Sequence, residues 1–282
     1  MTAIALLRPA ARRRALRRLP HSLLLLALSF ACCYPFIWTL GIAFGNGEQV
    51  FDFPPELWPR DAGWRHFIAV WDAIPLGRFF CNSLWISGLT TAGTLVVSAL
   101  AAFPLAKLRF RGRQLVFYAI LATLLLPSEI NFISNYVTIS RLGLDDSRLG
   151  VVLPSLAGAF GIYLMKHAFE EIPDEIVDAA RMDGAGDWQV FWRICLPLSL
   201  PYLATLGIFT LVWSWNVYVW PSVVLKTPEL YPLSVGVLYL KGAFATSTRM
   251  VAAGAVIAIA PVLLVFLCCQ RFFMRGMDGA VK

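Results

Sequence analysis

The sequence predicts an all-α membrane protein that crosses the bilayer six times. Hydrophobic residues make up 59% of the 282 residues, charged residues make up only 15%, and the mean hydropathy is +0.69. Such a composition offers too little polar surface to cover a soluble globule of this size, so lipid must solvate much of the chain. The apolar runs lack the period-two alternation of a membrane β-barrel, which leaves helices as the spanning elements.

Six runs of the chain are long and apolar enough to be spans. A hydrocarbon core about 30 Å thick requires a helix of roughly 20 apolar residues. Runs of this kind occupy approximately residues 19–44, 79–106, 115–140, 149–167, 194–220 and 250–270. Each backbone amide in lipid must be paired within its own segment, so every run is expected to be helical.

The positions of the basic residues predict the orientation of these spans. Lys and Arg residues concentrate in the N-terminal segment, in the second and fourth connecting regions and in the tail. The clearest cluster is a short loop that holds Lys107, Arg109, Arg111 and Arg113. By the positive-inside rule these segments, and both termini, lie in the cytoplasm.

The chain is expected to form a single domain. It contains no long linker, no low-complexity tract and no repeat of 20 to 50 residues. The predicted six-span domain covers residues 19–275. A basic cytoplasmic N-terminus (1–18) precedes it, and a cytoplasmic tail (276–282) follows it.

The stretch 170–193, after the fourth span, is more polar than a simple turn requires. Pro173 suits the first turn of a helix, and the acidic side chains of Asp174 and Glu175 are favourable at its positive end. A four-residue spacing predicts that this helix has one small apolar face, formed by Ile172, Ile176 and Ala180.

A glycine turn should end this helix and lead into a second one. Gly184 and Gly186 stop the first helix, and Asp187 can cap another helix that begins at Trp188. Two interpretations are open: an interfacial amphipathic hairpin without a partner, or a helix displayed for the groove of another protein. Small Ala and Gly residues would allow close approach of such a partner, and the flanking acids could pair with its basic residues.

At these residues the sequence resembles the inner-membrane permeases of binding-protein-dependent ABC importers. The signature of that family is Glu-Ala-Ala, three residues, Gly, nine residues, Ile, one residue and Leu-Pro. All the spacings match here, and Asp178 replaces the Glu with a carboxylate that is one methylene shorter. The resemblance implies an ATPase-coupling loop that includes Asp178, Ala179, Ala180, Asp183, Gly184, Ile194, Leu196 and Pro197.

The resemblance extends from about residue 82 to the C-terminus. It is greatest to the second permease of carbohydrate and glycerol-3-phosphate importers. The shared motifs are Asn82-Ser83-Leu84, Leu142-Gly143-Leu144, Leu153-Pro154, Trp215-Asn216, Trp220-Pro221 and Gln270-Arg271-Phe272-Phe273. The resemblance implies a bacterial cytoplasmic membrane, a second homologous permease, a cytoplasmic ATPase dimer and an extracytoplasmic solute-binding protein as partners.

The sequence also predicts what this chain does not do by itself. It has no GxxxxGK[ST] phosphate loop, so a partner must hydrolyse the ATP. No catalytic residue, cofactor or metal site is expected, because the six cysteines and three histidines show no ligand spacing. Nucleic-acid binding is not expected either, because the basic residues cluster at the ends of apolar runs.

A few polar and aromatic residues within the spans are candidates for lining a solute pathway. Polar side chains in hydrocarbon are costly unless they face protein or water, and aromatic faces suit sugar rings. The candidates are Asn82, Glu129, Asn131, Asn135, Trp215, Asn216 and Tyr218. Hydrogen bonds between helices and interfacial aromatic belts explain such residues equally well.

Two functions of other classes remain as alternatives. The acidic series Asp174, Asp178, Asp183 and Asp187 could hold Mg²⁺ in a membrane enzyme, but the Asp-Gly-x-x-Ala-Arg order of phosphatidyl-alcohol transferases is absent. A stand-alone secondary transporter should show paired broken helices and an ionisable relay, for which only Glu129 is a candidate.

Overall fold

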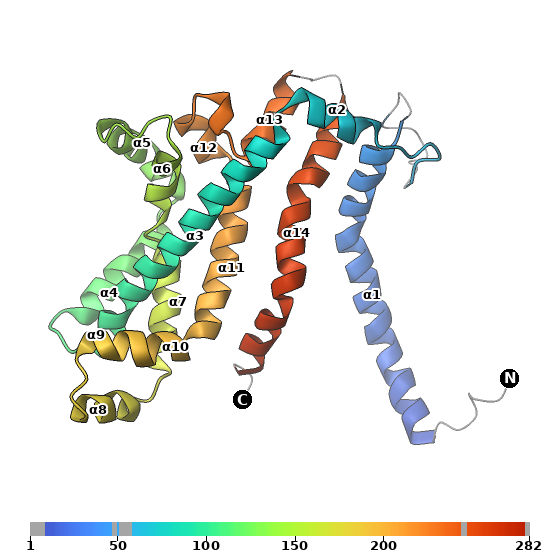
Figure 1. The fold of residues 1–282 in the computed structure, drawn as a ribbon. Coiled ribbons are helices and arrows are strands. Elements are labelled where there is room, and N and C mark those ends of the chain that lie inside the picture. Colours follow the sequence, from blue (N-terminus) through green and yellow to red (C-terminus); the bar gives the residue numbers. More distant parts are fainter. Residues whose placement is uncertain (1–8, 47–49, 51–57, 244–246, 280–282) are drawn as a thin grey trace. The chain divides into compact units, whose positions relative to one another are not determined.

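The all-α prediction is confirmed by a computed structural model that describes residues 9–46, 50, 58–243 and 247–279. Side chains are described from residue 20 onward, apart from 128–129, 241–243 and 269–279. Within these residues the secondary structure is helical, with a single isolated bridge between Gly45 and Ala62 (Figure 1).

Three helices are long and apolar enough to cross a membrane, and they correspond to the first, second and sixth predicted runs. They are α1 (Pro9–Phe44), α3 (Leu76–Lys107) and α14 (Thr248–Gly279). Their apolar parts cover Pro20–Phe44, Leu76–Lys107 and Thr248–Cys268, with 25, 32 and 21 residues.

The fourth and fifth predicted runs form bent pairs of helices. In the first pair, α6 (Arg148–Val152) with η3 (Leu153–Ser155) meets α7 (Ala159–Glu170) at 49°. In the second, α9 (Asp187–Val190), η4 (Phe191–Cys195) and α10 (Leu196–Leu198) meet α11 (Leu200–Asn216) at 74°. Pro201 stands in the first turn of α11, where its missing N–H breaks no intrahelical hydrogen bond.

The third predicted run, 115–140, is not one continuous helix. It is divided among α4 (Arg113–Ala122), η1 (Thr123–Leu125), η2 (Ser128–Asn131) and α5 (Phe132–Arg141). Pro127 lies at the break, and the residue before it, Leu126, is extended with ψ 127°. A proline pushes its predecessor out of the helical region, which explains the interruption. The described helices therefore provide three unbroken spans, or five if each bent pair is one span. The count of six remains a prediction.

The chain divides into two compact units, residues 1–70 with 244–256 and residues 71–243 with 257–282. In the first unit the end of α1 meets the chain that leads into α2 (Arg65–Ala73). The Phe44 ring packs against Trp64 and Phe67, and the N–H of Gly63 donates to the Phe44 carbonyl at 2.8 Å. These contacts hold residues 63–67 against the C-terminal end of α1.

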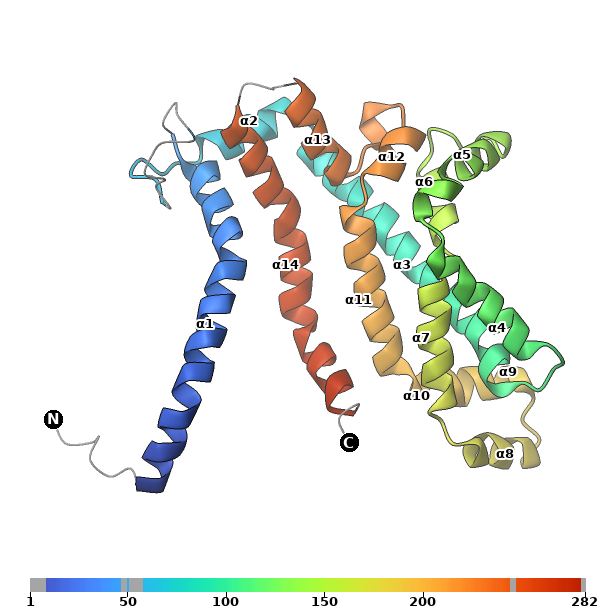
Figure 2. The ribbon, with the colours of Figure 1, turned by 180° about the vertical axis from the view of Figure 1, so that it is seen from behind.

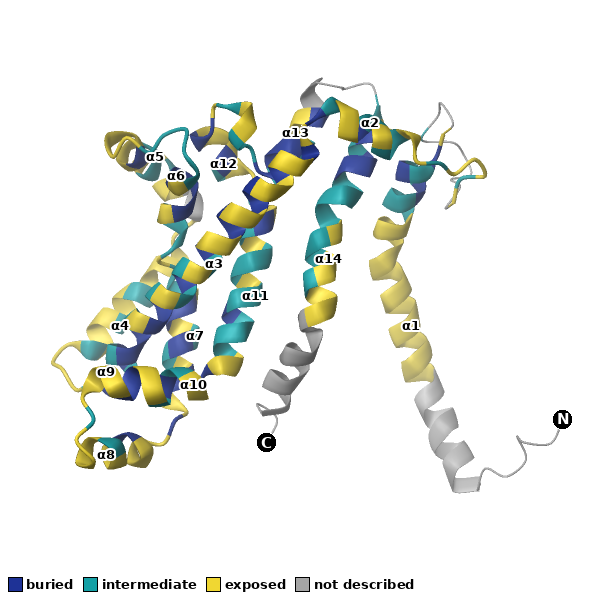
Figure 3. Ribbon diagram, in the orientation of Figure 1, coloured by how far each residue is buried: buried dark blue, intermediate teal, exposed yellow. Residues whose placement is uncertain are grey.

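The second unit is built on α3, which packs along α7 and α11 (Figures 1 and 2). Its main core includes Phe103, Met165, Phe169 and Phe191, all buried. Gly161 allows α7 to approach α3 closely, since a Cβ there would lie 2.3 Å from Ser98 Oγ. Figure 3 shows the buried side of α3 and α7 that results.

The remaining helices gather at the two ends of α3. One end carries α5, α6, α12 (Val219–Val224), η5 (Pro228–Leu230) and α13 (Leu233–Ala243) (Figures 1 and 2). There the Asp146 carboxylate accepts hydrogen bonds from the backbone N–H groups of Lys226 and Thr227 at 2.7 and 2.9 Å. The opposite end carries α4, α8 (Asp174–Met182), α9 and α10.

Candidate functional site

The polar stretch after α7 forms the helix and glycine turn that the sequence predicts. Helix α8 begins after Pro173 and places Asp174 and Glu175 in its first turn. It ends in a Schellman motif: the N–H of Ala185 donates to the Ala180 carbonyl at 2.9 Å, and the N–H of Gly184 donates to the Arg181 carbonyl at 3.0 Å. Gly184 has φ +86°, a conformation that glycine adopts without steric cost.

The start of the second helix differs by one residue from the expectation. Gly186, with an extended backbone, stands at the N-cap, and Asp187 is the first residue of α9 rather than its cap. The Gln189 side chain accepts from the Gly186 N–H at 3.1 Å. The carboxylate of Asp187 is therefore available to another partner, and it accepts a hydrogen bond from Arg181 Nη2 at 3.0 Å.

The predicted apolar face of α8 is partly wrong. Ile172 and Val177 are buried, and Ala180 packs against the same core, but Ile176 is 44% exposed. Ile172 precedes Pro173 and therefore lies outside helix α8, which begins at Asp174. The four-residue helical spacing thus does not place Ile172 on the same face as Ile176 and Ala180. The face that packs inward contains Val177 and Ala180, one turn apart.

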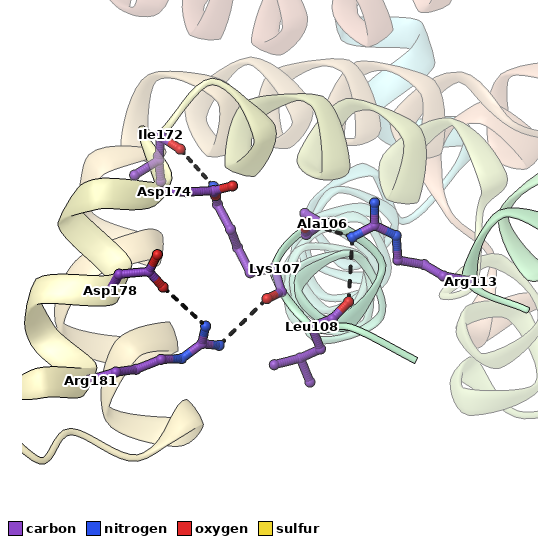
Figure 4. A network of polar contacts seen from close by, with 8 residues as sticks. All are labelled: Ala106, Lys107, Leu108, Arg113, Ile172, Asp174, Asp178 and Arg181. Carbon is purple, nitrogen blue, oxygen red and sulfur yellow. Dashed lines mark hydrogen bonds and ion pairs between the residues drawn. The ribbon is translucent and has the colours of Figure 1, made fainter. Parts of the chain in front are cut away.

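A buried lysine joins this loop to the end of α3 (Figure 4). The Nζ of Lys107 donates to the Ile172 carbonyl at 2.6 Å and to Asp174 Oδ1 at 2.5 Å. The Lys107 side chain is 3% exposed, whereas that of Asp174 is 75% exposed. The hydrogen bond from Lys107, and then its positive charge, lower the pKa of the Asp174 carboxyl.

Arg181 links α8 to the same end of α3 (Figure 4) and also contacts Asp187 of α9. Its Nη2 lies 3.5 Å from the Lys107 carbonyl oxygen and binds Asp187, while its Nη1 lies 3.7 Å from Asp178 Oδ1. The carboxylate of Asp178, the residue that departs from the family signature, is 65% exposed. It is therefore open to a partner's cation.

The outward side of the loop carries apolar groups beside these acids. Ile176 and Met182 on α8, and Trp188 on α9, are exposed, Met182 by 88%. Trp192 is exposed too, but it lines an apolar groove with residues of α3 and α11. What we call the loop surface is formed by Ile176, Met182 and Trp188 together with exposed Asp178, Ala179 and Asp183. Large exposed apolar side chains rimmed by charge are typical of a protein interface.

The last part of the signature lies inside the connection to α11. Ile194 belongs to η4, and Leu196 and Pro197 belong to α10. Ile194 and Leu196 are half-buried, and Leu196 packs against the main core. These residues therefore join the loop to α11, whereas Asp178, Ala179 and Asp183 face outward.

The predicted pathway residues are spread over several elements, and two of them use their polar atoms within the fold. The side-chain N–H₂ of buried Asn82 donates to the carbonyls of Glu229 and Tyr231 at 2.8 and 3.0 Å. The indole N–H of buried Trp215 donates to the Ala258 carbonyl at 3.1 Å. A role in lining the pathway remains a prediction for both residues.

The other candidates have more open surroundings. Asn216 is exposed and donates to the Val212 carbonyl one turn earlier at 2.7 Å. Tyr218 and Asn131 are exposed, and Asn135 is half-buried. The side chain of Glu129 lies outside the described residues.

Sequence reasoning missed two features of this site. In the sequence, Lys107 served only as one of the basic residues that indicate the membrane orientation. In the structure it connects the end of α3 to Ile172 and Asp174. The exposed side chain of Met182 was not predicted, and Trp188 was predicted only as the start of a helix. Both features depend on contacts between segments that are distant in the chain.

Comparison with known proteins confirms the resemblance to importer permeases. The model of the family described as "Binding-protein-dependent transport system inner membrane component" matches residues 94–279. The sn-glycerol-3-phosphate transport system permease protein UgpE of Pectobacterium atrosepticum is 32% identical, over 96% of this chain and 99% of the relative. The lactose transport system permease protein LacG of Rhizobium radiobacter is 33% identical, over 94% and 98%.

A solved structure agrees with these relatives. A chain of a bacterial ABC transporter involved in the import of the acidic polysaccharide alginate superposes with a TM-score of 0.78. It is 28% identical, and the match covers 95% of this chain and 99% of that chain. The family consists of transport components rather than enzymes, and its name places them in the inner membrane. The chain therefore belongs to the family of binding-protein-dependent transport system inner membrane components and is a permease subunit of an ABC importer.

Proposed function

We propose that this chain forms half of the translocation pathway for a sugar or sugar-like solute and is driven by a separate ATPase. The relatives are named for glycerol-3-phosphate and lactose, and the solved neighbour for alginate. All three solutes are polyhydroxylated, and they include neutral and anionic molecules. The proposed solute is therefore a polyhydroxylated molecule, either neutral or anionic.

The loop surface is the observation that carries the coupling role. Helix α8 is held to α3 by buried Lys107, while Ala179 and Met182 face outward. A short helix with small and apolar groups on its free face fits a groove in a partner protein. The exposed carboxylates of Asp178 and Asp183 would pair with basic residues beside that groove.

This arrangement supplies two mechanical connections for alternating access. A displacement of α8 reaches α3 through Lys107 and reaches α11 through α9, η4 and α10. In the proposed cycle, closure of the ATPase dimer after ATP binding moves the loop surface, and α3 and α11 follow. The solute site then becomes accessible from the opposite side of the membrane.

Two further partners and a membrane orientation belong to the proposed assembly. A second homologous permease completes the pathway, and an extracytoplasmic binding protein delivers the solute. Both termini and the loop surface lie in the cytoplasm, and six spans cover residues 19–275. To test the orientation, a chain without its native cysteines is expressed without the ATPase, which would otherwise cover this position. Met182→Cys in that chain should react with a membrane-impermeant maleimide only from the cytoplasmic side. Labelling from outside would contradict it.

Purification of the tagged chain in mild detergent tests the assembly. A second permease and an ATPase in stoichiometric amounts are the expected companions. A chain that purifies alone, or with copies of itself only, would contradict the proposal. Solute uptake that persists after ATP depletion and follows an ion gradient would instead support the stand-alone secondary transporter.

A further inference from the structure

A basic cavity lies beside the loop that connects α3 and α4. Its volume is about 630 Å³, and four of its lining side chains are cationic while two are acidic. The lining residues are Ala106, Lys107, Arg109, Phe110, Arg111, Arg113, Glu170 and Asp174. The cavity therefore combines the basic loop with the last residue of α7 and the first residue of α8.

The two carboxylates in this cavity already have lysine partners. Glu170 Oε1 lies 2.5 Å from Lys166 Nζ, and Asp174 Oδ1 lies 2.5 Å from Lys107 Nζ. Arg113 donates from Nη1 to the neutral carbonyl oxygens of Ala106 and Leu108, at 3.3 and 3.4 Å, so its charge is not offset there.

The other two arginines, Arg109 and Arg111, are exposed at the cavity. With both carboxylates paired, the three guanidinium groups leave an excess of positive charge. Guanidinium groups donate in a planar fork that matches the oxygens of a phosphate. The cavity is therefore chemically suited to a phosphate-bearing anion.

Helix α4, which begins at this cavity with Arg113, carries large exposed apolar side chains. In α4, Leu115 is 75% exposed and Tyr118 is 63% exposed, and Phe110 in the loop is 43% exposed. A soluble anion would gain nothing from such a neighbourhood. A phospholipid would place its phosphate among the arginines and its acyl chains along α4.

We propose that the loop between α3 and α4 binds the headgroup of an anionic phospholipid in this cavity. Basic pockets at the membrane surface of transport proteins are suited to such headgroups. Because the cavity shares Lys107 and Asp174 with the link to α8, the bound lipid would lie directly against the coupling loop. Lipid binding at this cavity requires only that the chain be inserted in a membrane. A negative result for lipid binding would therefore leave the proposed coupling to the ATPase unaffected.

The test compares lipid retention by matched variants of the full chain, purified with its partners. Native mass spectrometry counts phosphatidylglycerol retained after purification in micelles that contain phosphatidylcholine and phosphatidylglycerol. The variants are Arg109→Gln with Arg111→Gln and, as control, Arg141→Gln, an exposed arginine at the end of α5. Each lost cation should weaken retention about five-fold, and the control should match the wild type.

Three outcomes would overturn the proposal. The first is unchanged phosphatidylglycerol retention by the double variant. The second is arginine-dependent binding of inorganic phosphate without any preference for phosphatidylglycerol, which would indicate a site for a soluble anion. The third is loss of the ATPase from the double variant while phosphatidylglycerol is retained, which would assign the two arginines to a protein contact.

Discussion

The Nζ of Lys107, the last residue of α3, lies 2.5 Å from Oδ1 of Asp174, the first residue of α8. The two partners differ in their surroundings, because the lysine side chain is 3% exposed and the aspartate side chain is 75% exposed. The lysine is thus the desolvated member of the pair. This contact joins a long apolar helix to the loop that we propose couples the permease to its ATPase.

The unequal burial predicts unequal effects of removing either partner. Asp174→Asn leaves a buried ammonium without its counter-charge. Lys107→Met removes the buried charge and leaves an exposed carboxylate and the neutral Ile172 carbonyl without this donor. We expect Asp174→Asn to destabilise the chain by about 1–3 kcal/mol and Lys107→Met to cost less. Thermal unfolding of the purified complex measures both.

The double variant Lys107→Met with Asp174→Asn provides the control for this pair. If the contact is as described, the double variant should be more stable than Asp174→Asn alone, because no buried charge remains. Additive losses in the double variant would show that the two groups do not interact. Uptake should fall in all three variants.

The lowered pKa of Asp174 predicts how the contact depends on pH. The hydrogen bond from Lys107, and then the positive charge of Lys107, lower the pKa of the Asp174 carboxyl from its ordinary value of 3.8. A depressed carboxyl pKa contributes stability above the unfolded-state pKa and loses it as the pH falls through the folded-state pKa. The difference in melting temperature between wild type and Asp174→Asn should therefore be constant above about pH 5 and shrink below pH 3.8. A difference that already shrinks between neutral pH and pH 5 would contradict the assignment.

The backbone of the glycine turn predicts different effects at two neighbouring positions. Gly184 has φ +86° and Gly186 has φ −72°, while both have open space where a Cβ would stand. Gly184→Ala should therefore cost roughly 1–2 kcal/mol locally and displace α9, whereas Gly186→Ala should be nearly neutral. ATPase activity stimulated by the loaded binding protein is the readout. Equal activities of the two variants would show that the turn does not position the loop surface.

The hydrogen bonds of Asn82 and Asn216 predict different effects when each side chain is removed. Asn82→Ala removes two buried hydrogen bonds and should destabilise the chain by about 1–3 kcal/mol. Asn216→Ala removes only a bond to its own helix and should leave the melting temperature nearly unchanged. If Asn216 lines the pathway, this second variant should reduce solute uptake at normal stability. Normal uptake would remove Asn216 from the candidates.

Local rules predicted several elements well. The composition predicted an all-α membrane protein, and the order Pro173, Asp174, Glu175 followed by Gly184 predicted α8 and its end within one or two residues. These features depend on hydropathy, on helix-end chemistry and on glycine's tolerance of positive φ, all of which act within a few residues. The family signature was readable for the same reason, since its spacings lie within one short segment.

Other features depended on contacts that hydropathy does not encode. The break at Pro127 and the 74° bend before α11 interrupt runs whose composition alone suggests continuous spans. Pro127 and Pro201 are visible in the sequence, but prolines also occur inside membrane helices, as Pro104 does in α3. Whether a proline interrupts a span depends on whether neighbouring groups satisfy the freed carbonyl.

The sequence by itself determined the fold class, the family and the position of helix α8. Only the tertiary structure decided which side of that helix is free, because burial of Val177 and exposure of Ile176 depend on how α8 meets the core of α3 and α7. It also decided that Lys107 meets Asp174, 67 residues away. Pairing over such a separation requires two helix ends to be brought together by packing, and no local pattern of residues specifies it.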